Sequence, residues 1–198
     1  MWTATMTGMT HGYNGSQVLF RQAKARAIAA RRFVGEADQE QAEGRSGIER
    51  RQREKDAVIA TLVLAQGAGE AYVNWVFLQA GVRPSGTWID RWGGLRNAAR
   101  ELGRNNKFGL PSEHRRFFNE LDAWRNYLLH GDERSRKSLR QALEAQGRTD
   151  LTNETDLLDS AYAALVMDRA EAAFRWAEQQ TGIQAPFLDG AWAAFEEC

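Results

Sequence analysis

Three polar residues near the middle of the chain have the types and spacing that acid–base chemistry on an anion requires. They are Arg125, Asn126 and His130, within the stretch LDAWRNYLLHGD. A histidine exchanges protons near neutral pH and can act as a general acid or base. An arginine offers an anion a permanently charged, planar set of donors. Gly131 suits the left-handed position after a helix, so we expect a helix to end at His130, where its dipole favours the protonated imidazole.

The helix that would position these residues is amphipathic. At about 100° per residue, its apolar side comprises Phe117, Leu121, Trp124 and Leu128. Asp122, Asn126 and His130 recur every four residues on the other side, and Arg125 lies within side-chain reach of Asp122. Arg125 and His130 diverge by about 140° on an unbroken helix, so they converge only if the helix ends at His130. The alternative interpretation is a solvated helix face with a stabilising terminal histidine, and it predicts that Arg125 and His130 point in unrelated directions.

Other polar residues are candidates for supporting roles. Glu70 and Asn74 interrupt an apolar helix and could hold Arg125 in place, or they could form a partly exposed strip. Cations before and after the motif could bind phosphates, or could simply be solvated; they are Arg104, Lys107, Arg134, Arg136 and Lys137. Trp88 and Trp92 could stack on bases, or belong to the core. The three histidines and Cys198 show no metal-ligand spacing, so we predict neither a metal nor another cofactor.

Helix formers dominate the chain, and no stretch shows the alternation typical of strands. We expect an all-α antiparallel helical bundle. Long helices are predicted over residues 16–42 with Ser16 as N-cap, 48–80, and 112–130 with Ser112 as cap. A shorter helix is predicted over 88–102, weakened by Gly93–Gly94, and a short one is expected after Gly131. The last helix is predicted to be capped by Asn153 or Thr155 and to stop at Gly182, burying Leu158, Tyr162, Leu165 and Ala172. Residues 1–15 are predicted to be a disordered leader, 16–182 one domain with an extra N-terminal helix, and 183–198 a tail whose aromatic residues could dock onto the bundle.

The charges balance overall but not along the chain. Residues 1–149 carry eight more basic than acidic residues, and residues 150–198 carry eight more acidic than basic ones. A basic body suits a polyanionic partner, although basic and acidic helices can also pack together. A single cysteine fits a reducing cytoplasm. No signal peptide is evident, and polar residues interrupt the most apolar stretch, so we predict a cytoplasmic protein without a membrane span.

The segment RNYLLH, Arg125 to His130, resembles the R-x(4–6)-H signature of HEPN domains, including the polar residue that often follows the arginine. The resemblance covers roughly residues 48–180 and leaves the first 45 residues and the tail unexplained. It implies a small helical bundle, in many relatives a metal-independent endoribonuclease of toxin–antitoxin or phage-defence systems. It also implies a homodimer in which two motifs line one cleft. Other HEPN domains are inactive interaction modules that bind a partner protein or nucleic acid.

The resemblance also implies roles for individual residues. His130 would act as base toward the 2′-hydroxyl of RNA or as acid toward the 5′-oxygen, and Arg125 would stabilise the charged phosphorane. Asn126 would orient the imidazole or the phosphate. The products would carry 2′,3′-cyclic phosphate and 5′-hydroxyl ends. Some HEPN toxins have a tyrosine two residues after the histidine that their antitoxin modifies; here that position is Asp132, which argues against that form of regulation, although another antitoxin or regulatory protein is compatible with the motif.

Overall fold

The computed structural model describes residues 15–148, 153–183 and 185, and this part of the chain is helical with no strand. The all-α prediction is therefore confirmed. The elements are α1 (Gly15–Ala42), α2 (Ile48–Gln79), α3 (Trp88–Gly93), α4 (Leu95–Glu101), α5 (Ser112–His130), α6 (Glu133–Glu144), the 3₁₀ helix η1 (Glu154–Leu157) and α7 (Ser160–Thr181). Among these helices, none is long and apolar enough to cross a membrane.

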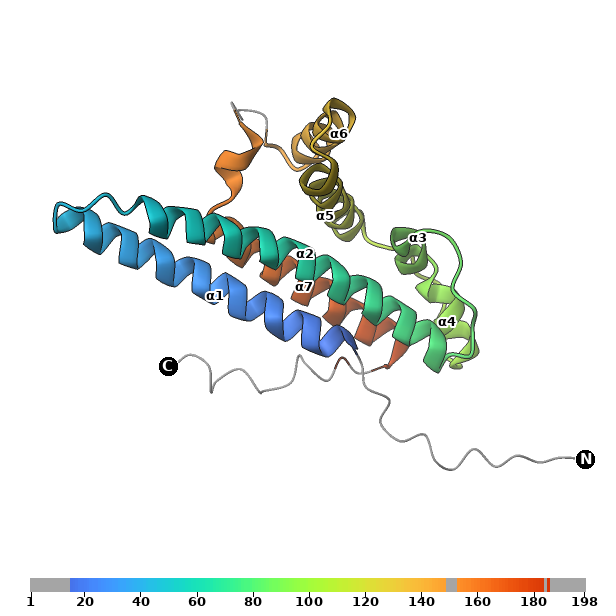
Figure 1. Ribbon diagram of the computed structural model, residues 1–198. Helices are drawn as coiled ribbons and strands as arrows, with labels where there is room; N and C mark the ends of the chain where they lie inside the picture. The colour runs from blue at the N-terminus through green and yellow to red at the C-terminus, as the bar shows by residue number, and fades with distance from the viewer. Residues whose placement is uncertain (1–14, 149–152, 184, 186–198) are drawn as a thin grey trace, which may run out of the picture.

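Three long helices, α1, α2 and α7, lie side by side and form the main body, and α5 with α6 projects from the α2 side (Figure 1). The direction of α7 follows from two contacts with α2. The Ser160 amide at the start of α7 donates to Glu54 Oε1 at 2.9 Å, and the Tyr72 hydroxyl donates to the Ile183 carbonyl at 3.2 Å. Helix α7 therefore runs parallel to α2 and antiparallel to α1.

The N-terminal helix, which the sequence predicts as an addition to the bundle, belongs to the core. Ala23, Ala30 and Ala37 recur every seven residues on α1, and all three are fully buried. A seven-residue repeat keeps one side of a helix facing its neighbour, and alanine lets two helices approach closely. Phe20, at the start of the same face, is buried and packs edge-on against Phe174 of α7 at 5.2 Å. Helix α1 thus contacts both of the other long helices.

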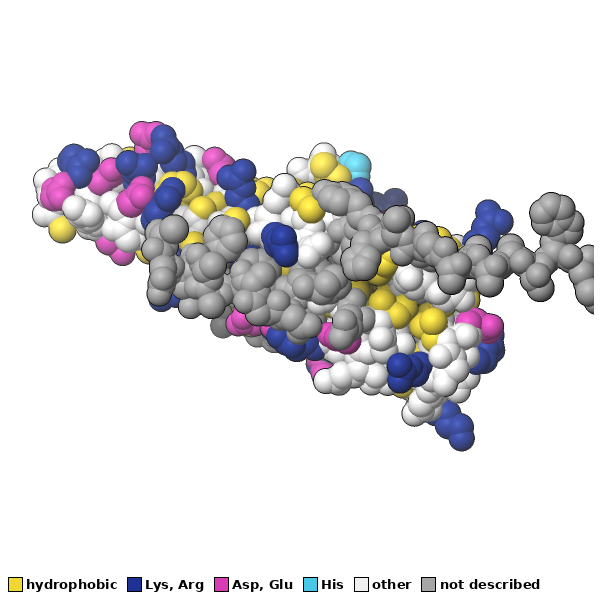
Figure 2. Space-filling model, turned by 90° about the horizontal axis from the view of Figure 1, so that it is seen from below, with side chains coloured by type: hydrophobic (Ala, Val, Ile, Leu, Met, Phe, Trp, Pro, Cys, Tyr) yellow, Lys and Arg dark blue, Asp and Glu magenta, His cyan; other side chains and the backbone are white. Residues whose placement is uncertain are grey.

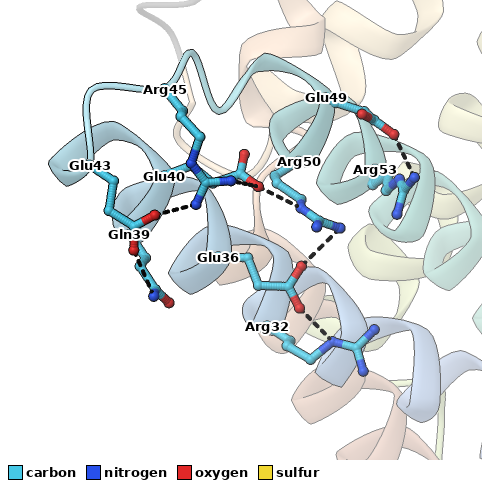
Figure 3. Close-up of polar contacts among 9 residues, drawn as sticks. All are labelled: Arg32, Glu36, Gln39, Glu40, Glu43, Arg45, Glu49, Arg50 and Arg53. Carbon is cyan, nitrogen blue, oxygen red and sulfur yellow. Dashed lines mark hydrogen bonds and ion pairs between the residues drawn. The ribbon is translucent and has the colours of Figure 1, made fainter.

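Ion pairs fix the register at the tip of the α1–α2 hairpin (Figure 3). The Arg50 guanidinium of α2 contacts Glu36 at 3.1 Å and Glu40 at 3.2 Å on α1. Arg51 contacts Asp38 at 2.6 Å. Acidic and basic side chains gather at this end of the molecule, at the left of Figure 2. Most of these side chains are partly exposed, so each pair stabilises little alone, but together they favour one alignment of the two helices.

The short helix α3 carries two indole rings, Trp88 and Trp92, into the core. Thr87 and Asp90 form a reciprocal capping box at the start of α3, which fixes the entry of the chain. Trp92 is fully buried and Trp88 is 7% exposed, so both belong to the core and cannot stack on bases. The predicted 88–102 helix is divided at Gly94, where a Cβ would lie 3.3 Å from the Phe77 ring. A glycine therefore allows the close approach of this turn to α2.

Several predicted helix ends differ from the structure. Helix α1 begins at Gly15, and Ser16 is a buried residue within it instead of a cap. Pro111, not Ser112, occupies the N-cap position of α5. Asn153 caps η1, whereas Asp159 caps α7 through a 2.7 Å bond from the Tyr162 amide.

The burial predicted for Leu158 and Tyr162 is confirmed, although Leu158 follows η1 and precedes α7. On α7, Leu165 is half-buried against the core and Ala172 is exposed. The spacing of Ala172 fits the apolar stripe, but a helix on the outside of a bundle buries a narrower stripe. Gly182 ends α7 in the left-handed conformation, as predicted. The leader 1–14 and residues 186–198 of the tail lie outside the described residues.

Candidate active site

Helix α5 positions the motif. Its buried side is the predicted one: Phe117, Leu121 and Trp124 are at most 3% exposed, and Leu128 is half-buried against the core. The helix ends at His130 as predicted, and Gly131 adopts φ 61° with its amide donating to the Tyr127 carbonyl at 2.8 Å. Asp132 then caps α6 by accepting from the Ser135 amide at 2.7 Å. The chain therefore turns sharply directly after His130.

The opposite side of α5 is more than a solvated face, because Asp122 is a shared acceptor between three elements. Its Oδ1 accepts from the Trp88 indole of α3 at 3.0 Å and, more weakly, from Gln66 Nε2 of α2 at 3.4 Å. Its Oδ2 accepts from Asn126 Nδ2 at 3.1 Å. Trp88 and Gln66 are both buried. The contacts of Asp122 thus tie α5 to the core and hold the amide group of Asn126.

Arg125 and His130 are exposed, but they point to different sides of α5. The helix is continuous between them, so their side chains diverge by about 140° and are offset by about 7.5 Å along the axis. Leu129 lies between these two directions on the helix surface and is 64% exposed. The end of α5 within one chain therefore presents an apolar side chain flanked by an arginine and a histidine.

Glu70 and Asn74, expected to hold Arg125, contact Arg91 instead. The Arg91 guanidinium of α3 donates to Asn74 Oδ1 at 2.7 Å and lies 3.8 Å from Glu70 Oε1. It also donates to the Gly86 carbonyl at 3.1 Å. The polar strip on α2 therefore fastens the α2–α3 connection. Among the described residues, no hydrogen bond or ion pair holds Arg125.

The five predicted phosphate-binding cations lie in three different environments. Arg134 and Lys137 are exposed on α6, which starts directly after the motif. Arg136 shares buried Glu154 with Arg140, at 3.2 Å from both carboxylate oxygens. The guanidinium of Arg104 lies against Gly182 at the end of α7, and exposed Lys107 follows in the same α4–α5 loop. Of these five cations, Arg134 and Lys137 thus combine exposure with proximity to the motif in the chain.

A buried polar chain beneath the motif was not found from the sequence. Trp124 Nε1 donates to the Tyr162 hydroxyl at 2.6 Å, and that hydroxyl donates to Glu120 Oε1 at 2.5 Å. Arg169 contacts the other oxygen of Glu120 at 3.2 Å. Burial raises the pKa of Glu120, although these donors oppose the shift. This hydrogen-bond network holds α5 against α7. Its only signal in the sequence was Glu120, a glutamate on the apolar side of an amphipathic helix.

Comparison with known proteins does not add to this picture: no protein family, curated protein or solved structure matches the chain.

Proposed function

We propose that the protein is a metal-independent endoribonuclease of HEPN type, active in the cytoplasm as a homodimer, in a toxin or phage-defence setting. The observation that carries this proposal is the end of α5, where Arg125 and His130 are both exposed on a helix that stops at His130. The resemblance of the RNYLLH segment supplies the reaction class. In that reaction His130 exchanges the proton of the 2′-hydroxyl or the 5′-oxygen, and Arg125 neutralises the phosphorane.

A second copy would complete the site. Because Arg125 and His130 diverge within one chain, they approach one phosphate most closely when they come from different subunits. Leu129, 64% exposed between them, would supply the apolar contact across a two-fold axis. Arg134 and Lys137 on α6 would then extend the basic surface for RNA, and Asp122 would fix the amide of Asn126 at its edge.

The decisive assay is RNA cleavage in the presence of EDTA with analysis of the product ends. We expect His130→Ala and Arg125→Ala each to lower the cleavage rate by about 100-fold or more. Arg116→Ala is the matched control, since Arg116 is an exposed arginine on the same helix outside the motif; it should stay within about twofold. Wild-type cleavage that persists in His130→Ala would refute the mechanism.

Subunit mixing tests the shared site. A dimer of one Arg125→Ala and one His130→Ala subunit contains one site with both groups intact and one with neither. Because about half of the dimers in an equal mixture are of this kind, we expect about a quarter of wild-type activity to return. Complete inactivity of a mixture shown to contain mixed dimers would mean that each subunit works with its own arginine and histidine.

The second candidate is an inactive HEPN-like module that binds a partner protein or nucleic acid. The exposed Leu129, flanked by charges, favours it, because an apolar centre with a polar rim is the usual composition of a binding surface. This candidate predicts no RNA cleavage by the wild type under any condition, while Leu129→Asp abolishes association with the partner. Cyclic phosphate ends produced by wild type and absent with His130→Ala would exclude it.

A further inference from the structure

A groove on the outer side of the α1–α2 hairpin lies apart from the α5 motif. It has a volume of about 700 Å³ and is lined mainly by small and aliphatic side chains, among them Ala25, Ala29, Ile59, Ala60, Val63 and Leu64. Val63 is 45% exposed, and Ile28 of α1, next to this lining, is 44% exposed. Alanines on both helices leave the groove hollow. A concave apolar surface of this kind is typical of a site that another segment covers.

The last described residues lie within reach of this groove. The Tyr72 hydroxyl of α2 holds the Ile183 carbonyl at 3.2 Å, and Ala185 is 1% exposed. Leu64, at the near end of the groove, is eight residues before Tyr72 on α2, or about 12 Å along the helix. Residues 186–198 span up to about 40 Å when extended. Val63, nine residues before Tyr72, faces about the opposite side of α2, so the segment must also pass around the bundle, and its length is sufficient to reach the groove.

The composition of residues 186–198 complements the groove. The sequence PFLDGAWAAFEEC contains three aromatic residues, three acidic residues and no Lys or Arg. Large aromatic rings suit a hollow floored by alanines, and burying them is strongly favourable. Helix α1 carries five basic residues before its first acid, Glu36. Arg26 of α1 and Asp56 of α2 line the groove on its two sides, so the acidic residues of the segment would face opposite charge only along its α1 side.

We propose that residues 186–198 bind back onto their own bundle in the α1–α2 groove, with Trp192 and Phe195 over the alanine floor and the acidic residues beside α1. The interaction would cover this groove on the hairpin. It is independent of RNA cleavage, because neither helix of the groove carries the motif.

The single cysteine of the chain, Cys198, makes the proposal testable by disulfide formation. Val63→Cys places a second thiol in the groove, nine residues before Tyr72. Ala172→Cys is the matched control, because Ala172 is exposed on α7 nine residues before Thr181 and outside the groove. A bound segment raises the effective concentration of Cys198 at one place only. Under mild oxidation we expect the Val63→Cys chain to form its intramolecular disulfide about tenfold faster than the Ala172→Cys chain.

Changes in the segment itself provide the second test without altering the bundle. Trp192→Ala with Phe195→Ala should slow crosslinking of Val63→Cys to the rate of the Ala172→Cys control. Equal rates at both positions, or no disulfide at either, would overturn the proposal. A disulfide between two chains, seen as a dimer on a non-reducing gel, would also overturn it and assign the groove to a second copy.

Discussion

Replacing Asp122 with alanine tests whether the polar side of α5 is built into the core. The substitution removes the acceptor that the structure gives to the Trp88 indole, at 3.0 Å, and also releases Asn126 Nδ2. Trp88 is 7% exposed, so water reaches its N–H poorly. Asn126 is half-buried and can bond to water instead. The loss of unfolding free energy should therefore come mainly from the Trp88 N–H, which is left without an acceptor.

A buried donor left without an acceptor costs about 1–3 kcal/mol. Adding a small loss from Asn126, we expect Asp122→Ala to lower the free energy of unfolding by about 2 kcal/mol. For a chain of this size that corresponds to a fall in Tm of about 4–8 °C. The spectroscopic signature should be a change in tryptophan fluorescence, since the carboxylate would no longer contact the Trp88 ring.

Urea unfolding of four proteins measures the effect: wild type, Asp122→Ala, Trp88→Phe and the double variant. In the Trp88→Phe background, which lacks the indole donor, Asp122→Ala should lower the free energy of unfolding by at least about 1 kcal/mol less than it does in the wild-type background. Asn126→Ala is the control for the half-buried part of the cluster and should lower the free energy of unfolding by less than about 1 kcal/mol. The reasoning is wrong if Asp122→Ala destabilises equally in both backgrounds, or changes stability by less than about 0.5 kcal/mol.

Three further predictions concern residues around the motif. Burial opposes ionisation of Glu154, but hydrogen bonds from Arg140 and Arg136 lower its pKa from 4.5 to about 2. The carboxylate thus stabilises the fold above pH 4.5 and loses this effect as the pH falls toward 2. Glu154→Gln should cost about 2 kcal/mol at pH 7, after discounting for the partly exposed arginines, and the difference from wild type in urea unfolding should vanish near pH 2. Burial raises the pKa of Glu120 above 4.5, so its contribution to stability falls as the pH rises above that value. Glu120→Gln should therefore flatten the decline in unfolding free energy measured from about pH 4 to 8, and an unchanged slope would contradict this assignment. Gly131→Ala places a side chain at φ 61° and should lower Tm in a calorimetric scan by about 2–4 °C, for about 1 kcal/mol.

Most of the fold follows from local patterns in the sequence. Apolar spacing located the buried side of α5, and Gly131 and Gly182 marked two helix ends, because only glycine adopts the left-handed conformation without strain. Caps were less predictable. Asn153 and Asp159 are both good cap residues six positions apart, and the choice between them depends on where η1 packs, which no local pattern specifies.

The site was only partly predictable for a related reason. Spacing placed Asp122 and Asn126 on one face and His130 at the helix end, and the structure agrees. It could not identify the partners of Glu70 and Asn74, because Arg91 reaches them from another helix. Spacing also could not distinguish Arg136, which forms an ion pair with Glu154, from Arg134, which is exposed. Contacts between distant parts of the chain decide these assignments.

The order of elements along the chain has a consequence for how the protein folds in time. Helices α1 and α2 are joined by a short turn, and their alanine stripe and ion pairs lie within residues 15–79, which leave the ribosome before the rest of the bundle. Contacts between neighbours in sequence form fast. Helix α7, which completes the body, begins at Ser160, whereas α2 ends at Gln79. We therefore expect the α1–α2 hairpin to form first during synthesis and to keep its core side exposed until α7 has been synthesised and packs against it.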